Sequence, residues 1–319
     1  MRARTDAGLV LALLSAATFG TSGALATSLI GAGWTPGAAV LVRVSIAAVV
    51  LTVPALLQLR GHRLEVGRSL RTVGSYGIVA VGGAQLCYFN AVHHLSVAVA
   101  LLLEYSGVLL VVGWLWVRHG QRPRRLTVAG ALIAITGLVL VLDLLGNHDV
   151  DAVGVLWGLG AGVGLACYFV ISAGMHDPLP PLVIAWGGLA AGAVALGLAA
   201  VVGALPFTTS TEAVSFRGTA VSWLVPVLGL SLVAAAVAYV AGIVAARLLG
   251  AKVASFVGLS EVIFAVLFAW LLLGQRLDGV QVAGAVLVVA GIALVRIDEL
   301  TRPGQNLDQA DSSSSAAVA

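Results

Sequence analysis

Charged residues are scarce in this chain: Asp, Glu, Lys and Arg together make up 10% of its 319 residues, whereas a soluble domain usually carries about 25%. Hydrophobic residues make up 60%, and a soluble fold of this length could not bury so much apolar surface. The apolar residues lie in blocks of about 18 residues or more, which is the length that crosses a bilayer core as a helix. These features exclude a soluble protein and predict a helical integral membrane protein.

Cysteine is also rare, and neither copy has the setting of a disulfide or a metal ligand. Cys87 and Cys167 lie inside apolar blocks, where a small buried side chain is expected. His93 and His94 are adjacent, so their side chains diverge by about 100° on a helix, and the sequence offers no third ligand beside them. We therefore expect no metal site and no cofactor.

Motifs of energy-driven or catalytic proteins are missing from the sequence. It contains no GxxxxGK[ST] loop, which indicates that this chain does not hydrolyse ATP. It contains no HExxH motif and no recognisable Ser-His-Asp arrangement. The net charge is only +3, and the basic residues lie in short loops, so no nucleic-acid partner is expected. We predict that the protein is not an enzyme.

The apolar blocks predict an all-α integral membrane protein with ten transmembrane helices. Short loops separate the blocks, as in a compact bundle. The predicted spans are 8–30, 37–59, 72–93, 97–117, 126–145, 152–174, 181–204, 220–245, 253–273 and 279–296.

The distribution of basic residues predicts the orientation of these spans. With a cytoplasmic N-terminus, only Arg217 and Arg276 of the 17 Lys and Arg residues fall in external segments, and Arg43 lies inside a span. The other fourteen (17 minus 3) fall in internal segments, as the positive-inside rule requires. We therefore expect a multi-pass protein of the cell membrane with both termini cytoplasmic. Residues 301–319 are polar and predict a disordered cytoplasmic tail.

Two segments of the chain repeat each other. "WVRHGQRPRRLTVAGALIAITGLVLV" (Trp116–Val141) aligns without gaps with "WLLLGQRLDGVQVAGAVLVVAGIALV" (Trp270–Val295), at a constant spacing of 154 residues. Five spans per half is an odd number, so the second half enters the membrane upside down. The sequence thus predicts a first five-helix repeat over 1–148 and a second, inverted repeat over 149–300, a common architecture of secondary transporters.

The same blocks carry a family resemblance. "EYSGVLLVVGWLWVRHGQRP" and "EVIFAVLFAWLLLGQRL" resemble the paired signatures of the drug/metabolite transporter superfamily, EamA-like branch, over about residues 8–296. The resemblance implies ten helices in two inverted halves and a transport function. It includes Glu261, which stands directly before the position of the missing proline in the second half. It also includes Glu104, which lies one turn before the matching position of its own span, and Arg43, which follows Pro36 by a few residues. The chain departs from the family pattern where Val108 and Val262 replace the usual prolines.

Arg43, Glu104 and Glu261 are the ionisable residues that fall well inside the spans. A charge at a helix centre costs about 2.5–3.5 kcal/mol on insertion scales, so such residues usually face the bundle interior. At about 1.5 Å per residue, Arg43 and Glu104 both lie roughly 10 Å below the external surface, which makes an ion pair between them possible. Glu261 approaches the midplane from the cytoplasmic side.

Each of these residues has two open interpretations. Arg43 is either a fixed interhelical link or an anchor for an anionic substrate group, and Glu104 is either its partner or a proton-coupling site. Glu261 is either hydrogen-bonded and neutral or titrates during transport. Polar and aromatic side chains nearby in the spans are either belt residues or lining residues. The candidate substrate-binding or coupling residues are Arg43, Glu104, Glu261, Gln85, Tyr88, Tyr105, Tyr168 and Tyr239.

Together these features predict a proton-coupled secondary active transporter that exports small metabolites or drug-like compounds by alternating access. The export direction is implied by the resemblance. An uncoupled facilitator or channel is the alternative, and a membrane-embedded lipid-modifying enzyme is a further one. The expected partners are a small-molecule substrate, protons and the lipid bilayer, and the sequence indicates no oligomeric state.

Overall fold

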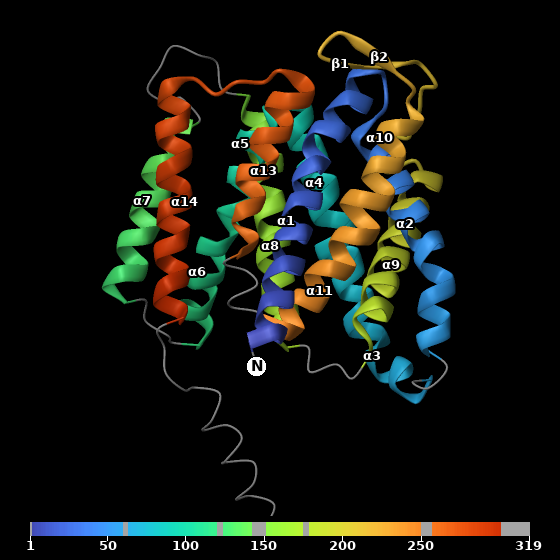
Figure 1. Cartoon of the computed structure of the whole chain (residues 1–319), viewed down its shortest axis with the longest axis horizontal. Helices are drawn as coiled ribbons and strands as arrows, with labels where there is room; N and C mark the ends of the chain where they lie inside the picture. Colours follow the sequence, from blue (N-terminus) through green and yellow to red (C-terminus); the bar gives the residue numbers. More distant parts are fainter. Residues whose placement is uncertain are drawn as a thin grey trace, which may run out of the picture.

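The computed structural model of the chain describes residues 2–59, 63–119, 124–141, 151–174, 179–249 and 257–300. Within them the chain forms a bundle of helices that stand side by side (Figure 1). Helix α1 begins and helix α14 ends at the same face of this bundle (Figure 1). The predicted tail 301–319 and the predicted boundary between residues 148 and 149 lie outside the described residues.

The predicted first half forms helices over each of its five expected spans. The third span is continuous through a π-helical segment, η1, and the fourth is interrupted at Ser106. The elements are α1 (Arg2–Gly31), α2 (Pro36–Leu59), α3 (Arg63–Ser75), η1 (Tyr76–Gly83), α4 (Ala84–His94), α5 (Val97–Tyr105), α6 (Gly107–His119) and α7 (Arg125–Val141).

The predicted second half also forms helices in its five expected spans. Before the eighth span lies a short β-hairpin, β1–β2, in which Val214 pairs with Val221, so the all-α prediction was wrong for this segment. The elements are α8 (Ala152–Gly174), α9 (Pro181–Val201), β1 (Val214–Phe216), β2 (Thr219–Val221), α10 (Leu224–Leu228), η2 (Gly229–Val237), α11 (Ala238–Leu249), α13 (Ser260–Phe268), η3 (Ala269–Leu273) and α14 (Gly279–Leu300).

The hairpin corrects the predicted start of the eighth span from residue 220 to Leu224. The turn between the strands has φ of 50° at Arg217 and 85° at Gly218, the two successive positive values of a tight type I′ hairpin turn. The apolar residues before Leu224 therefore belong to a connection outside the helical bundle.

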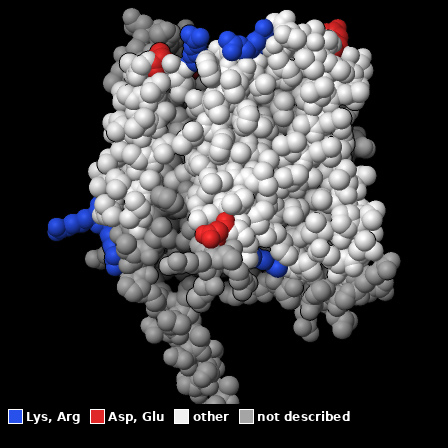
Figure 2. All heavy atoms as spheres, viewed as in Figure 1, with Lys and Arg blue, Asp and Glu red and all other residues white. Residues whose placement is uncertain are grey.

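The surface of the bundle suits a lipid environment. Val49, Val117 and Val201 are 71%, 86% and 85% exposed, and soluble proteins rarely expose so many large apolar side chains together. Most of the charged side chains on the face in Figure 2 lie near its upper and lower edges, with a broad uncharged band between them. Within the described residues, four helices are long and apolar enough to cross a membrane: Asp6–Gly31, Pro36–Leu59, Pro181–Val201 and Leu224–Leu249.

Helices α7 and α14, which carry the repeated sequence, pack against each other (Figure 1). A methyl group added at Gly130 would meet the carbonyl oxygen of Gly291 at 2.6 Å, and one added at Gly137 would meet that of Gly284 at 2.6 Å. The pairing runs antiparallel, since the number rises in one helix as it falls in the other. A shift of 154 residues turns Gly130 into Gly284 and Gly137 into Gly291, so the contact maps onto itself, as an inverted repeat requires.

The π-helical segments show the same relation. Shifting η1 (Tyr76–Gly83) by 154 residues gives residues 230–237, which lie within η2 (Gly229–Val237). A π-helical turn is rare and is often found at functional sites. Its occurrence at matching positions in both halves agrees with the predicted repeat and marks the region around these segments for closer attention.

Candidate functional site

Arg43 lies at the centre of the bundle and is tied to three neighbouring segments. Its side chain, on α2, is only 1% exposed. The Nη1 atom donates to Ser22 Oγ of α1 at 2.8 Å and to Gln85 Oε1 of α4, and Nη2 donates to the carbonyl oxygen of Ala234 in η2 at 2.5 Å. Hydrogen bonds from a charged donor are among the stronger ones in proteins. The guanidinium therefore links α1, α4 and η2 to α2.

An aromatic ring completes the surroundings of Arg43. The Arg43 Cζ atom lies 5.5 Å from the centroid of the Phe89 ring, within the range of a cation–π interaction. Gln85 and Phe89 are four residues apart on α4 and so share one helix face. Among the described residues no ion pair joins Arg43 to Glu104 or Glu261, so the structure does not form the Arg43–Glu104 pair that the depths of the two residues made possible. Neutral polar groups, a carbonyl and a ring surround the guanidinium instead.

Glu104 lies near Arg43 but has no fixed partner among the residues that the structure describes. Its side chain, near the end of α5, is 8% exposed, and its carboxylate makes no hydrogen bond within the part of the chain that the structure describes. Glu104 lies within electrostatic range of both Glu261 and Arg43. A carboxylate held this deep without a fixed partner can take up a proton or bind a cation.

Glu261, in the first turn of α13, contacts Tyr105 of α5. The Tyr105 hydroxyl lies 3.1 Å from Glu261 Oε2 and 2.9 Å from the carbonyl oxygen of Gly258. A phenol has a single proton to donate. A protonated Glu261 donates to Tyr105 and leaves the phenolic proton for Gly258, whereas an ionised Glu261 accepts the phenolic proton itself. The protonation state of Glu261 is thereby connected to the backbone just before α13.

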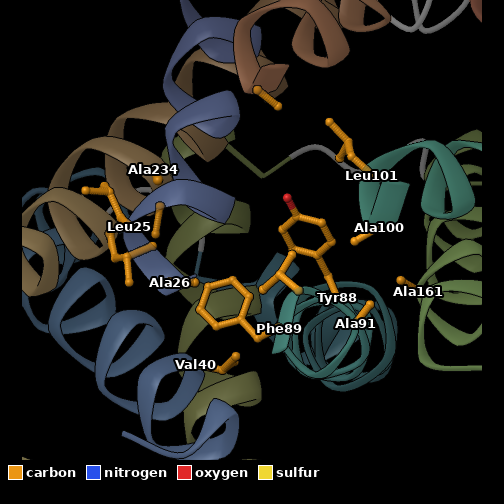
Figure 3. Close-up of a cluster of buried hydrophobic side chains, with 14 of the residues drawn as sticks. Leu25, Ala26, Val40, Tyr88, Phe89, Ala91, Ala100, Leu101, Ala161 and Ala234 are labelled. Carbon is orange, nitrogen blue, oxygen red and sulfur yellow. The ribbon is translucent and has the colours of Figure 1, made fainter. Parts of the chain in front are cut away.

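Two further tyrosines reach this region with hydroxyls that have no partner in the described part of the chain. Tyr88 on α4 is 3% exposed and Tyr239 on α11 is 7% exposed, and neither hydroxyl makes a hydrogen bond to any described residue. Both lie within electrostatic range of Glu104 and Glu261. The Tyr88 oxygen points away from Phe89, toward the region between α1 and the helix that carries Leu101 (Figure 3).

The predicted residue Tyr168 has a different neighbour. Its ring, on α8, lies 5.8 Å from that of Tyr76 in η1, centroid to centroid. Arg43, Gln85, Glu104, Tyr105, Glu261, Tyr88 and Tyr239 therefore gather in one region, and Tyr168 contacts that region through Tyr76. None of these placements tests their role in transport, which stays a prediction.

Serine side chains mark the helix interruptions beside both carboxylates. Ser106 Oγ donates to the Leu103 carbonyl oxygen at 2.6 Å, and Ser260 Oγ donates to that of Val257 at 2.7 Å. A shift of 154 residues maps one hydrogen bond onto the other. Serine that bonds back to its own helix often bends it. The chain thus interrupts both helices although Val108 and Val262 stand where the family usually has proline.

Sequence reasoning missed several groups that surround Arg43. Ser22 is a polar residue inside an apolar block and could have been noticed. Phe89 follows Gln85 by one helical turn, which was a further available signal. The carbonyl of Ala234 had no signal, because it accepts a bond within a π-helical segment that the residue pattern does not reveal.

Comparison with known proteins agrees with the architecture. A family model described as "EamA-like transporter family" matches residues 6–143 and 152–297. The "Uncharacterized transporter YwfM" of Bacillus subtilis (strain 168) is 32% identical over 98 residues, which are 30% of this chain and 33% of that protein. A solved structure described only as "Crystal structure of protein" is similar with a TM-score of 0.59 and 23% identity, over 92% of this chain and 98% of that one. At this identity the likeness shows the fold alone.

Proposed function

Because the chain belongs to the EamA-like transporter family, as the resemblance predicted, we propose that this membrane transporter is a proton-coupled exporter that works by alternating access. In this proposal Glu261 and Glu104 exchange protons for a small metabolite or drug-like substrate. The protein lies in the cell membrane with both termini in the cytoplasm. The observation that carries the proposal is the contact of Glu261 with Tyr105 beside the unpartnered carboxylate of Glu104.

The contact between Glu261 and Tyr105, beside Glu104, supports proton coupling for a chemical reason. A deep carboxylate that stays ionised needs a cation, and the guanidinium of Arg43 makes no ion pair with either glutamate. The remaining ways to neutralise the two charges are protons or a bound cation. Since Tyr105 accepts from a protonated Glu261 and donates to an ionised one, both states of Glu261 have a hydrogen-bond partner at the same position.

The two interrupted helices support alternating access. Glu104 lies two residues before Ser106, and Glu261 lies one residue after Ser260, so each carboxylate is placed beside an interruption of its helix. Loading or unloading a proton at these positions acts where each helix is interrupted, at Ser106 and at Leu259. With halves that are inverted relative to each other, a change in one half opens the site to one side of the membrane.

The test is transport by the full chain in proteoliposomes that enclose a pH-sensitive dye. A panel of amino acids, nucleosides and organic cations is added under an imposed pH gradient, and the proton flux that each compound drives is recorded. We expect saturable proton flux with at least one class of compound. Glu261→Gln should lower that flux by at least about tenfold, whereas Glu212→Gln, an exposed carboxylate in the connection after α9, should leave it unchanged.

The outcomes separate the alternatives. Substrate flux that does not depend on the pH gradient would remove proton coupling and leave an uncoupled facilitator. Proton flux that persists in Glu261→Gln would make this carboxylate structural. Chemical modification of added lipid in detergent, without any gradient, would favour a lipid-modifying enzyme.

A further inference from the structure

The central site is the region formed by Arg43, Glu104, Glu261, Tyr88 and Tyr239. Its charges and hydrogen bonds limit the class of substrate that it can bind. Arg43 is the only basic residue there among those that the structure describes, and its guanidinium is already engaged by Ser22, Gln85 and Ala234. Its Nε atom is fully enclosed and without a partner. Three of its five N–H donors are thus occupied and a fourth is enclosed, so this guanidinium is a poor anchor for an anionic substrate group.

Three other groups without hydrogen-bond partners in the described residues carry oxygen atoms that can accept. Glu104, Tyr88 and Tyr239 are each more than nine-tenths buried, come from three different helices, and carry oxygen atoms that make no hydrogen bond within the described residues. These oxygens are not among the fully enclosed atoms without a partner, which in the described residues are Thr27 Oγ1 and Arg43 Nε, so they border accessible space. Oxygen atoms on three helices that border such space and lie within electrostatic range of Glu261 are an arrangement that the donor group of a ligand would satisfy.

The aromatic rings around these oxygens suit a positive charge as well. The negative face of a phenol ring attracts a cation within about 6 Å of its centroid. Tyr239 also contacts Phe19 edge to face, with the ring centroids 4.9 Å apart, which fixes the ring for contact with an apolar body. A ligand with an ammonium group and an aromatic or aliphatic body would satisfy both the oxygens and the rings.

We propose that the central site binds a protonated organic amine, whose ammonium group donates to Glu104, Glu261 and the Tyr88 and Tyr239 hydroxyls. This inference rests on the proposed transport function and names its substrate class. On binding, the ammonium takes the place of the protons on the two carboxylates, and those protons are released to the solvent. No covalent bond forms or breaks.

The test uses three ligands that share a phenyl-ethyl body and differ in charge: 2-phenylethylamine, phenylalanine and 3-phenylpropionate. Each is titrated calorimetrically into the purified full chain in detergent near neutral pH. We expect the amine to bind at least about tenfold more tightly than the zwitterion, since each hydrogen bond to a charged group contributes about a factor of ten or more. The anion should show no binding. Repeating the titration in buffers of different ionisation enthalpy counts the protons released.

Variants connect the binding to the named residues. Glu104→Gln and Glu261→Gln should each weaken binding of the amine by at least about tenfold, and Tyr88→Phe by about threefold. Glu212→Gln serves as the matched control and should bind the amine as the unmodified chain does. Melting temperatures of all variants show whether a loss of binding reflects loss of the fold, and Tyr88→Phe keeps the ring and its packing.

Equal or tighter binding of phenylalanine or 3-phenylpropionate would overturn the inference, as would absence of binding by both 2-phenylethylamine and a bulkier cation, tetraphenylphosphonium. These outcomes differ from failure of the proposed function. Amine binding with proton release, but without proton flux in proteoliposomes, would keep the amine site and remove coupled transport. Proton flux driven by amino acids, without amine binding, would keep coupled transport and remove the amine site.

Discussion

Tyr105 and Glu261 are joined by a hydrogen bond of 3.1 Å that connects α5 of the predicted first half to α13 of the predicted second half. These two helices belong to matching spans, the fourth and the ninth. Because the same Tyr105 hydroxyl lies 2.9 Å from the carbonyl of Gly258, a phenol of the predicted first half bridges the Glu261 side chain and the Gly258 backbone of the predicted second half. Proton binding at Glu261 would therefore act directly on a contact between the two predicted halves.

Tyr105→Phe tests this connection, because it removes the hydroxyl and keeps the ring. We expect proton-coupled flux to fall by about tenfold, while stability changes by no more than the roughly 1 kcal/mol of a single hydrogen bond. Flux is measured in proteoliposomes and stability by thermal unfolding in detergent. Thr136→Val is the control, since it removes an exposed hydroxyl of α7 that bonds only within its own helix. Unchanged coupling in Tyr105→Phe would show that the phenol does not take part.

Arg43 is expected to hold the bundle together more than to bind substrate. Ser22→Ala leaves one N–H of the buried guanidinium without its partner, and an unsatisfied buried polar group destabilises by about 1–3 kcal/mol. We therefore expect Ser22→Ala and Arg43→Gln to lower the melting temperature, with the larger effect for Arg43→Gln. An Arg43→Gln protein that melts like the unmodified chain, but no longer binds substrate, would instead support the anion-anchor interpretation.

The sequence predicted the helices well, for identifiable reasons. Long apolar blocks admit one structure in lipid, so all ten spans contain helices where expected. The β-hairpin was missed because the apolar residues of Thr219–Val221 continue directly into the block that begins at Leu224. The gathering of Arg43, Glu104 and Glu261 could be anticipated from their depth, but their partners could not. Ser22, Phe89 and the Ala234 carbonyl are set by rotation of the helices about their axes, which apolar blocks leave undetermined.

The close contact of α7 with α14 makes a symmetric prediction about glycine. A methyl group at Gly291 would lie 2.5 Å from the Ala134 nitrogen, and one at Gly137 would lie 2.6 Å from the Val288 nitrogen. Overpacking of this kind destabilises by about 1–3 kcal/mol. Because the two positions correspond by the 154-residue shift, Gly137→Ala and Gly291→Ala should lower the melting temperature by similar amounts.

The control for this pair is Gly113→Ala on α6, where an added methyl group meets no atom within 4 Å. Alanine is favoured over glycine in a helix interior by about 1 kcal/mol, so this variant should melt at the same temperature as the unmodified chain or higher. A large loss in one of Gly137→Ala and Gly291→Ala but not the other would contradict a symmetric contact.

Ser106 and Ser260 should govern the bending of the helices beside the carboxylates. Ser106→Ala and Ser260→Ala each remove a side-chain bond to the helix's own backbone, which lets the interrupted turn close. We expect transport to slow by about threefold to tenfold in each, and by more in the double variant, with little change in melting temperature. Ser28→Ala is the matched control, because Ser28 makes the same kind of bond to Leu25, at 2.8 Å, inside the unbroken helix α1. Equal transport rates in Ser106→Ala, Ser260→Ala, the double variant and Ser28→Ala would show that Ser106 and Ser260 take no part in the transport cycle.

Asp151, at the start of α8, gives a prediction about the pH dependence of stability. One carboxylate oxygen accepts from the Gly154 N–H at 3.0 Å, at the start of α8, and the other lies 2.8 Å from His94 Nδ1 of α4. The backbone N–H first, and the histidine second, lower the pKa of Asp151 below its usual value. A carboxyl group whose pKa is lowered by folding stabilises the fold above its unfolded pKa of about 3.9 and loses this contribution as the pH falls through the lower, folded value.

Asp151→Asn isolates the charge, because the amide keeps an oxygen that can accept from Gly154. At about neutral pH the variant should melt below the unmodified chain, and the gap should close as the pH falls from about 5 to about 2. The contact with His94 is exposed, so added salt should also narrow the gap in melting temperature by screening it. Melting curves in detergent over this pH range check the prediction. A gap that stays constant with pH would mean that the carboxylate acts at this position through its shape alone, and that its charge does not help to hold α4 against α8.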